Sequence, residues 1–280
     1  MPFEIVRAKT GFCFGVKRAI DMISRAAAER GQVETLAPIV HNQQVMDRLA
    51  GLGVRVAASL DDVRGSSVAI GSHGVAPDIE AEMRRRFADV IDTTCHSVHR
   101  AQLAARHFAE DGLYVIVYGE ADHPEVRGIL GYAGNKGVAT LDVASLTNLP
   151  KQLGVLSQTT QIPERFNRFA AALIDSALTK GAEIRFIDTI CHDIPDRQQS
   201  AIEVARKVDL MLVVGSHTSA NTNHLVDLCA TATRTLLVET ADQIDPAALK
   251  GVRRIGITAG ASTASETIEE VVKRLESMQT

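Results

Sequence analysis

The chain has 280 residues, of which 45% are hydrophobic, and a formal net charge of -4. This length favours more than one α/β subdomain, and the scattered Lys and Arg residues argue against a nucleic-acid partner. The longest apolar runs, such as LMLVV at 210–214, are too short to span a membrane, and the N-terminus lacks the apolar core of a signal peptide. We therefore expect a soluble cytoplasmic protein with no membrane partner.

Apolar, strand-like runs alternate with amphipathic stretches along the chain. The runs at 67–72, 114–119 and 210–216 are each followed within a few residues by a helical pattern. Such alternation is typical of parallel strands joined by crossover helices. The sequence therefore predicts an α/β protein with mostly parallel sheets.

Three of the four cysteines mark an internal repeat. The stretch IDTTCH at 91–96 returns almost unchanged as IDTICH at 187–192. Cys13, Cys95 and Cys191 are followed 28 residues later by His41, His123 and Ser219, in that order. Two positions further on stand the polar residues Gln43, Glu125 and Asn221, and a later strand end in each unit carries His73, Thr159 or Ser262. This self-similarity predicts three repeats.

The predicted repeats are three similar small subdomains. They span 14–95, 96–190 and 191–280, and residues 1–13 complete the third. Ligands of parallel α/β sheets bind beyond the carboxyl ends of the strands, where the polar residues of each repeat fall. We hypothesise that the subdomains surround a pseudo-threefold axis, so that the three thiols converge at its centre.

Three convergent thiols favour an iron–sulfur cluster, because thiolates are the usual ligands of such clusters. Three protein ligands leave one iron of a [4Fe-4S] cubane open to substrate. The alternative is zinc held by the same thiolates and an imidazole from His96 or His192. Cys229 follows Leu225 and Leu228 at helical spacing, so we expect it to be a buried core residue.

The polar residues of the repeats suit a small anion. The expected donors are His41, His73, His123, Ser219, Asn221 and Ser262. The sequence has neither a P-loop nor a GxGxxG motif, so a small phosphate or diphosphate ester fits better than a nucleotide. Glu125 is the candidate proton donor beside that anion, with Thr159 and His123 as its catalytic partners.

These residues lie in motifs that resemble the LytB-type 4-hydroxy-3-methylbut-2-enyl diphosphate reductase family of the methylerythritol phosphate route to isoprenoids. The motifs are GFCFGVKRAI, PIVHNQQV, SHGV, DTTC, HPEV, SQTT, TSANTN and TAGAS, and they occur in collinear order along essentially the whole chain. The set is specific to this family.

The resemblance implies a central [4Fe-4S] cluster held by Cys13, Cys95 and Cys191. It also implies that the six donors bind the substrate diphosphate, and that Glu125 delivers protons with the help of Thr159. A ferredoxin or flavodoxin supplies electrons in such enzymes. The hydroxyl is lost as water, and isopentenyl and dimethylallyl diphosphate are the products.

The chain departs from the family pattern at several places beside the motifs. The changed positions are His96, Tyr132, Asp193, Ile194 and Ala220. None of them is an expected cluster ligand or the expected proton donor. They leave two alternatives open: a paralogue acting on another allylic phosphate, and a non-catalytic iron–sulfur protein that senses redox state or diphosphate.

Overall fold

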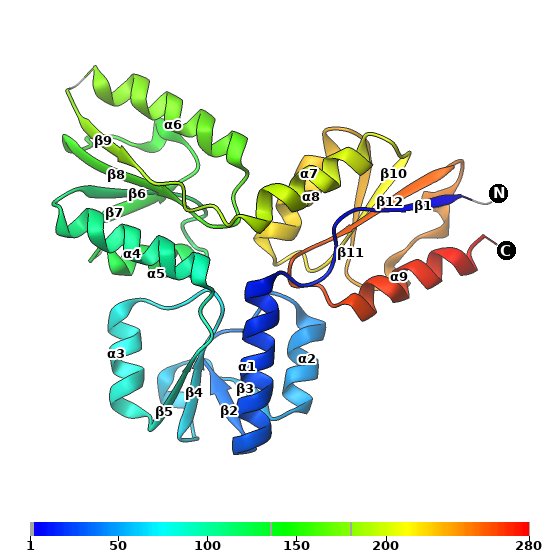
Figure 1. Ribbon diagram of the computed structural model, residues 1–280, viewed down its shortest axis with the longest axis horizontal. Helices are drawn as coiled ribbons and strands as arrows, with labels where there is room; N and C mark the ends of the chain where they lie inside the picture. The colour runs from blue at the N-terminus through cyan, green and yellow to red at the C-terminus, as the bar shows by residue number, and fades with distance from the viewer. Residues whose placement is uncertain (1–2, 135, 180, 280) are drawn as a thin grey trace. The chain divides into compact units, whose positions relative to one another are not determined.

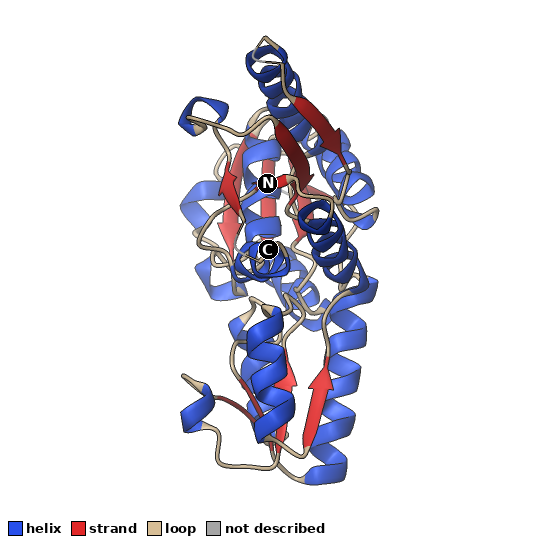
Figure 2. Ribbon diagram, turned by 90° about the vertical axis from the view of Figure 1, so that its left-hand side faces the viewer, coloured by secondary structure: helices blue, strands red, loops and turns tan. Residues whose placement is uncertain are grey.

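The computed structural model describes residues 3–279 except 135 and 180. Within them, the strands form three four-stranded parallel sheets, flanked by helices (Figure 1 and Figure 2). This confirms the predicted α/β class with three small parallel-sheet subdomains. The predicted boundaries at 14–95, 96–190 and 191–280 stay a prediction.

The strands and helices follow one another in the expected alternation. The first sheet has the order β3 (Val54–Val56), β2 (Val33–Thr35), β4 (Ser67–Ile70), β5 (Asp89–Asp92). The second has β7 (Gly137–Thr140), β6 (Tyr114–Tyr118), β8 (Gln152–Ser157), β9 (Glu183–Phe186). The third has β1 (Glu4–Arg7), β12 (Arg254–Ala259), β10 (Leu210–Val214), β11 (Arg234–Val238).

The helices connect these strands. They are α1 (Phe14–Arg30), α2 (Gln43–Gly51), α3 (Pro77–Arg86), α4 (His96–Glu110), α5 (Pro124–Tyr132), α6 (Pro163–Leu178), α7 (Asp193–Ala205), α8 (Ala220–Ala230) and α9 (Ser265–Ser277). Proline opens α3, α5 and α6, where the missing N–H costs no helical hydrogen bond. No helix among the described residues is long and apolar enough to cross a membrane.

The chain divides into two compact units. The first comprises Met1–Lys17, Val40–Arg48 and His192–Thr280 and contains the third sheet. The second comprises Arg18–Ile39 and Leu49–Cys191 and contains the other two sheets. Two of the four divisions fall inside α1 and α2, so each of these helices contributes to both units.

The core of the first unit lies on both faces of the third sheet. Alternate residues of β10 face opposite ways, as the period of two requires. Leu210, Leu212 and Val214 belong to a cluster with residues of α9, whereas Met211 and Val213 belong to one with residues of α7 and α8. Cys229 is fully buried in the latter cluster, so its predicted core role is confirmed.

The second sheet is covered in the same way. Helices α4 and α5 lie on one face and α6 on the other (Figure 1). The ring of Phe108 of α4 packs directly against Gly154 of β8, where the absence of a Cβ atom leaves room for it. A Cβ added at Gly154 would lie 2.4 Å from the Cγ atom of Phe108.

We predict that Gly154→Ala destabilises the protein by about 1–3 kcal/mol, because the methyl group displaces the base of a buried ring. Urea unfolding followed by circular dichroism measures the change. Gly51→Ala is the matched control, since a Cβ at this helical position meets nothing within 4 Å. Equal stability of the two variants would contradict the packing described for α4 and β8.

Candidate active site

Glu125 lies at the start of α5, immediately beyond the second sheet. His123 is the N-cap of this helix, and its Nδ1 atom accepts a hydrogen bond from the Glu125 backbone N–H at 3.2 Å. The backbone N–H of His123 donates to the carbonyl of Glu120 at 2.9 Å. The carboxyl group is thereby placed in the interior, where Glu125 is only 1% exposed.

Thr159, just beyond the end of β8, holds this carboxyl group through two hydrogen bonds. Its backbone N–H donates to Oε1 of Glu125 at 2.6 Å, and its hydroxyl donates to Oε2 at 2.9 Å. Burial raises the pKa of Glu125 to about 7; the two hydrogen bonds from Thr159 oppose the rise, and the charge of Glu120 adds to it. An acid with this pKa can hold and release a proton near neutral pH.

The same threonine is joined to the segment of Cys191. The backbone N–H of Cys191 donates to the Thr159 carbonyl at 2.9 Å. Cys95 follows β5, serves as the N-cap residue of α4, and donates its backbone N–H to the carbonyl of Ser72 at 3.0 Å. Both thiols are partly buried and free.

The two thiols of the second unit interact electrostatically. Burial raises the pKa of the Cys95 thiol, and the negative charges of Cys191 and Glu125 raise it further, while backbone N–H groups at the start of α4 oppose the rise. A cationic ligand that both thiolates share would relieve this repulsion, because metal binding requires deprotonated thiols.

His73 and His123 lie side by side in the second unit. Their ring centroids are 5.4 Å apart, and the rings are nearly perpendicular at 77°. His73 precedes Gly74, whose φ of +68° and contact with the buried Gln102 amide leave no space for a side chain. Gly74 and Gln102 therefore fix the turn that presents His73.

The first unit brings together the other predicted residues. Cys13 precedes α1, and its backbone N–H donates to the carbonyl of Ala261 at 3.1 Å. Its Sγ atom accepts from the backbone N–H of Val16 at 3.4 Å. The neighbouring Ser262 donates its hydroxyl to the carbonyl of His41 at 3.3 Å, so the segments of Cys13, His41 and Ser262 meet beyond the end of β12.

Ser219 and Asn221 lie at the start of α8. Ser219 is the N-cap and accepts from the backbone N–H of Thr222 at 3.4 Å. Asn221 is 5% exposed, and both polar atoms of its amide are buried without a hydrogen-bond partner among the described residues. Such atoms are costly unless a ligand or water satisfies them. Burial also lowers the pKa of His41, which favours its neutral form.

Sequence reasoning missed two buried glutamines that support these residues. Gln158 is fully buried, and its Oε1 accepts from the backbone N–H of Glu120 at 3.1 Å. Gln102 is 1% exposed and donates to the carbonyl of Val75 at 3.4 Å. Gln158 stands inside the motif SQTT, which was the available signal, whereas nothing in the helical pattern distinguishes Gln102.

Comparison with known proteins gives consistent matches along the whole chain. The model of the LytB protein family matches residues 5–276. A 4-hydroxy-3-methylbut-2-enyl diphosphate reductase of Dehalococcoides mccartyi strain CBDB1 is 55% identical over 269 residues, which cover 95% of this chain and 95% of that protein. The enzyme of the same name from Geobacter sulfurreducens is 42% identical over 278 residues, covering 98% and 97%.

Two solved structures are also similar. One is described as (E)-4-hydroxy-3-methyl-but-2-enyl diphosphate reductase, the terminal enzyme of the non-mevalonate pathway. It matches with a TM-score of 0.72 and 34% identity, and the match covers 99% of this chain and 100% of that structure's chain. The other, the E-1-hydroxy-2-methyl-but-2-enyl-4-diphosphate reductase from Plasmodium falciparum, matches with a TM-score of 0.88 and 26% identity, covering 98% and 88%.

We predict that Thr159→Val raises the pKa of Glu125 above about 7, by roughly one pH unit, because the carboxylate loses its hydroxyl donor. Carbon NMR of the labelled glutamate carboxyl groups measures this value, and Glu125→Gln assigns the signal. Thr140→Val is the control, since its hydroxyl bonds with residues 142 and 145, away from Glu125. An unchanged or lowered pKa in Thr159→Val would contradict the assignment of this contact.

Proposed function

The chain belongs to the LytB family, and we propose that it removes the hydroxyl group of 4-hydroxy-3-methylbut-2-enyl diphosphate to give isopentenyl and dimethylallyl diphosphate. The observation that carries this function is the fully buried Glu125, held by Thr159 with a pKa of about 7. The reaction consumes two electrons and two protons: the C–O bond breaks, its oxygen leaves as water, and a carbon of the allyl fragment gains a proton.

The residues present fit a [4Fe-4S] cluster. Cys13, Cys95 and Cys191 form no disulfide among the described residues, and each lies next to the start of a helix. They are partly exposed, whereas Cys229 is fully buried. Thiolates are the usual protein ligands of such clusters. Cys13, Cys95 and Cys191 would hold it, and the group would supply single electrons and an open iron for the substrate hydroxyl.

The substrate diphosphate is assigned to six donors. They are His41, His73, His123, Ser219, Asn221 and Ser262. Ser219 and Asn221 lie in the first turn of α8, where the helix dipole favours an anion. The buried amide of Asn221, which lacks a partner among the described residues, is the strongest single indication that a polar ligand binds there.

Glu125 is the proposed proton donor. Its burial keeps water away from the carboxyl group, and its raised pKa keeps a large fraction protonated at neutral pH. Thr159 orients the group with two hydrogen bonds, and His123 anchors the helix turn that carries it. His123 thus belongs both to the anion-binding set and to the catalytic set.

A ferredoxin or flavodoxin is the proposed electron donor, and the proposed location is the cytoplasm. The alternatives of a paralogue and of a non-catalytic sensor are disfavoured. Curated relatives up to 55% identical over 95% of the chain are named as reductases of this one substrate. A sensor would also have no need for a buried acid with a pKa of about 7.

We predict that Glu125→Gln lowers turnover of 4-hydroxy-3-methylbut-2-enyl diphosphate by at least about 100-fold, because the amide cannot donate the proton. The assay uses anaerobically reconstituted protein with reduced methyl viologen, and the products are identified. Glu164→Gln is the matched control, because Glu164 also follows the opening proline of a helix but is exposed. Iron content and substrate affinity should be unchanged in both variants.

Retained turnover in Glu125→Gln would refute its role as proton donor. No turnover by the wild-type protein with an intact cluster would refute the substrate assignment itself.

We also predict that Cys13→Ser, Cys95→Ser and Cys191→Ser each lower the iron and sulfide bound after reconstitution, because serine is a poor ligand of iron–sulfur clusters. Cys229→Ala should bind as much iron as the wild type, since this thiol is buried in the core of the third sheet. Chemical analysis of iron, sulfide and zinc measures the outcome. Stoichiometric zinc without sulfide would favour the zinc alternative instead.

A further inference from the structure

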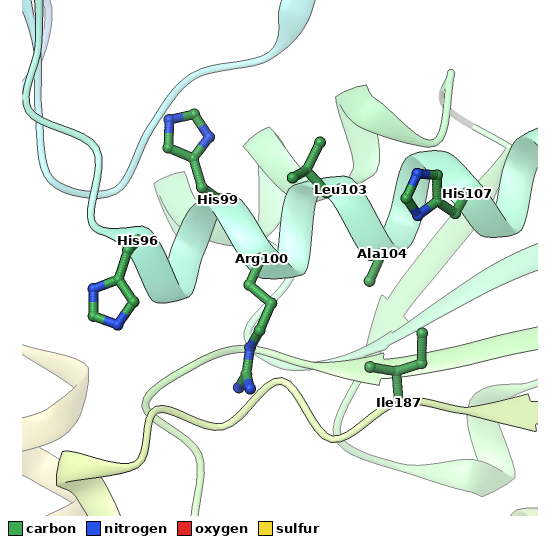
Figure 3. A pocket seen from close by; sticks show the side chains of 7 residues that line it. All are labelled: His96, His99, Arg100, Leu103, Ala104, His107 and Ile187. Atoms are coloured by element: carbon green, nitrogen blue, oxygen red, sulfur yellow. The ribbon is translucent and has the colours of Figure 1, made fainter.

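A surface groove lies between α4 and the segment that follows β9. Its volume is about 450 Å³, and it is lined by His96, His99, Arg100, Leu103, Ala104, His107 and Ile187 (Figure 3). Figure 3 shows Arg100 reaching from α4 toward the segment that carries Ile187. Neither the predicted catalytic residues nor the predicted diphosphate donors line this groove.

The groove lies next to two of the proposed cluster ligands. Helix α4 begins with His96, the residue after Cys95, and the Nδ1 atom of His96 is 4.0 Å from the Cys95 sulfur. On the other side, Arg100 donates to the carbonyl of Ile190 at 2.9 Å, one residue before Cys191. An electron carrier seated here would therefore reach both thiol segments through a few bonded atoms.

The groove exposes two large apolar side chains, one from α4 and one from the segment after β9. Leu103 is 39% exposed and Ile187 is 37% exposed, although both are large aliphatic side chains. Exposed apolar groups rimmed by polar side chains are typical of protein interaction sites. A groove along one helix that exposes aliphatic groups suits a transient protein contact of modest area.

The charge of the groove selects an acidic partner. Its lining contains one guanidinium and three imidazoles and no carboxylate, although the chain as a whole has a net charge of -4. Two carboxylates lie nearby in the sequence but do not line the groove: Asp92 pairs with His99 at 3.2 Å, and Asp188 accepts from the backbone N–H of Ile190 at 2.9 Å.

We propose that this groove is the docking surface for a small acidic protein that carries single electrons. The proposal rests on the proposed function, because a reductive loss of hydroxyl needs two electrons from outside the chain, and the sequence has no dinucleotide-binding motif to supply a hydride. The carrier is oxidised, the allylic C–O bond is cleaved, and the protons come from the acid already described. Complementary charge would speed and orient the encounter.

The test is the double variant Leu103→Glu/His107→Glu. It places two carboxylates in the groove and leaves Arg100 and the neighbours of the cysteines unchanged. Binding is measured with flavodoxin, an acidic flavoprotein, labelled with ¹⁵N and titrated with each protein. We expect the dissociation constant to rise at least about tenfold. Flavodoxin-driven turnover at low donor concentration should fall by a similar factor, while turnover driven by methyl viologen stays within about twofold of wild type.

Arg85→Glu is the matched control. It adds the same net negative charge on α3, where Arg85 is exposed and paired with Glu82, and it should leave flavodoxin binding unchanged. Unchanged binding in the double variant would overturn the proposal, and so would an equal loss in Arg85→Glu, which would indicate only general charge repulsion. Failure of the wild type to turn over the substrate with viologen would instead refute the proposed function, while the binding result would still decide the role of the groove.

Discussion

The contacts of Thr159 determine how the predicted acid is placed in the second unit. Its N–H and hydroxyl groups bind the Glu125 carboxyl group, and its carbonyl binds the backbone of Cys191. A single residue at the end of β8 therefore sets the position of both the acid and the segment of a thiol. A small polar residue is required here, because a larger side chain would displace the carboxyl group it holds, and an apolar one would leave a buried oxygen unsatisfied.

Two of the positions that depart from the resembled family pattern, Asp193 and Tyr132, have structural partners of their own. Asp193 forms an ion pair with Lys9 at 2.6 Å and with the buried Arg197 at 3.1 Å. Burial acts to raise the pKa of Asp193, but these two cations hold it below its ordinary value. Tyr132 donates to Glu80 of α3 at 3.4 Å. Asp193 and Tyr132 therefore make contacts within their own units. Of the five positions, His96 is the one that lines the groove along α4.

The sequence pattern predicts candidate site residues more readily than the residues that support them. The spacing of 28 residues after each cysteine identifies His123, and the adjacent Glu125 follows from it, because repeats place equivalent residues at equivalent strand ends. Gln102 and Gln158 escaped notice, since their roles depend on which segments pack against them. The groove escaped for the same reason: His96, Arg100, Leu103 and His107 form one face of α4, but only the segment around Ile187 turns that face into a groove.

The acid and the thiols share one electrostatic environment. Negative charge on Glu125 raises the pKa of Cys95, and the interaction is mutual, because each charge disfavours the other. Negative charge added near Cys95 and Cys191 therefore favours the protonated form of Glu125. Because the carboxyl group is buried, little water screens this effect. The carboxyl group of Glu125 and the thiol of Cys95 are therefore coupled through charge, and this coupling requires no movement of the fold.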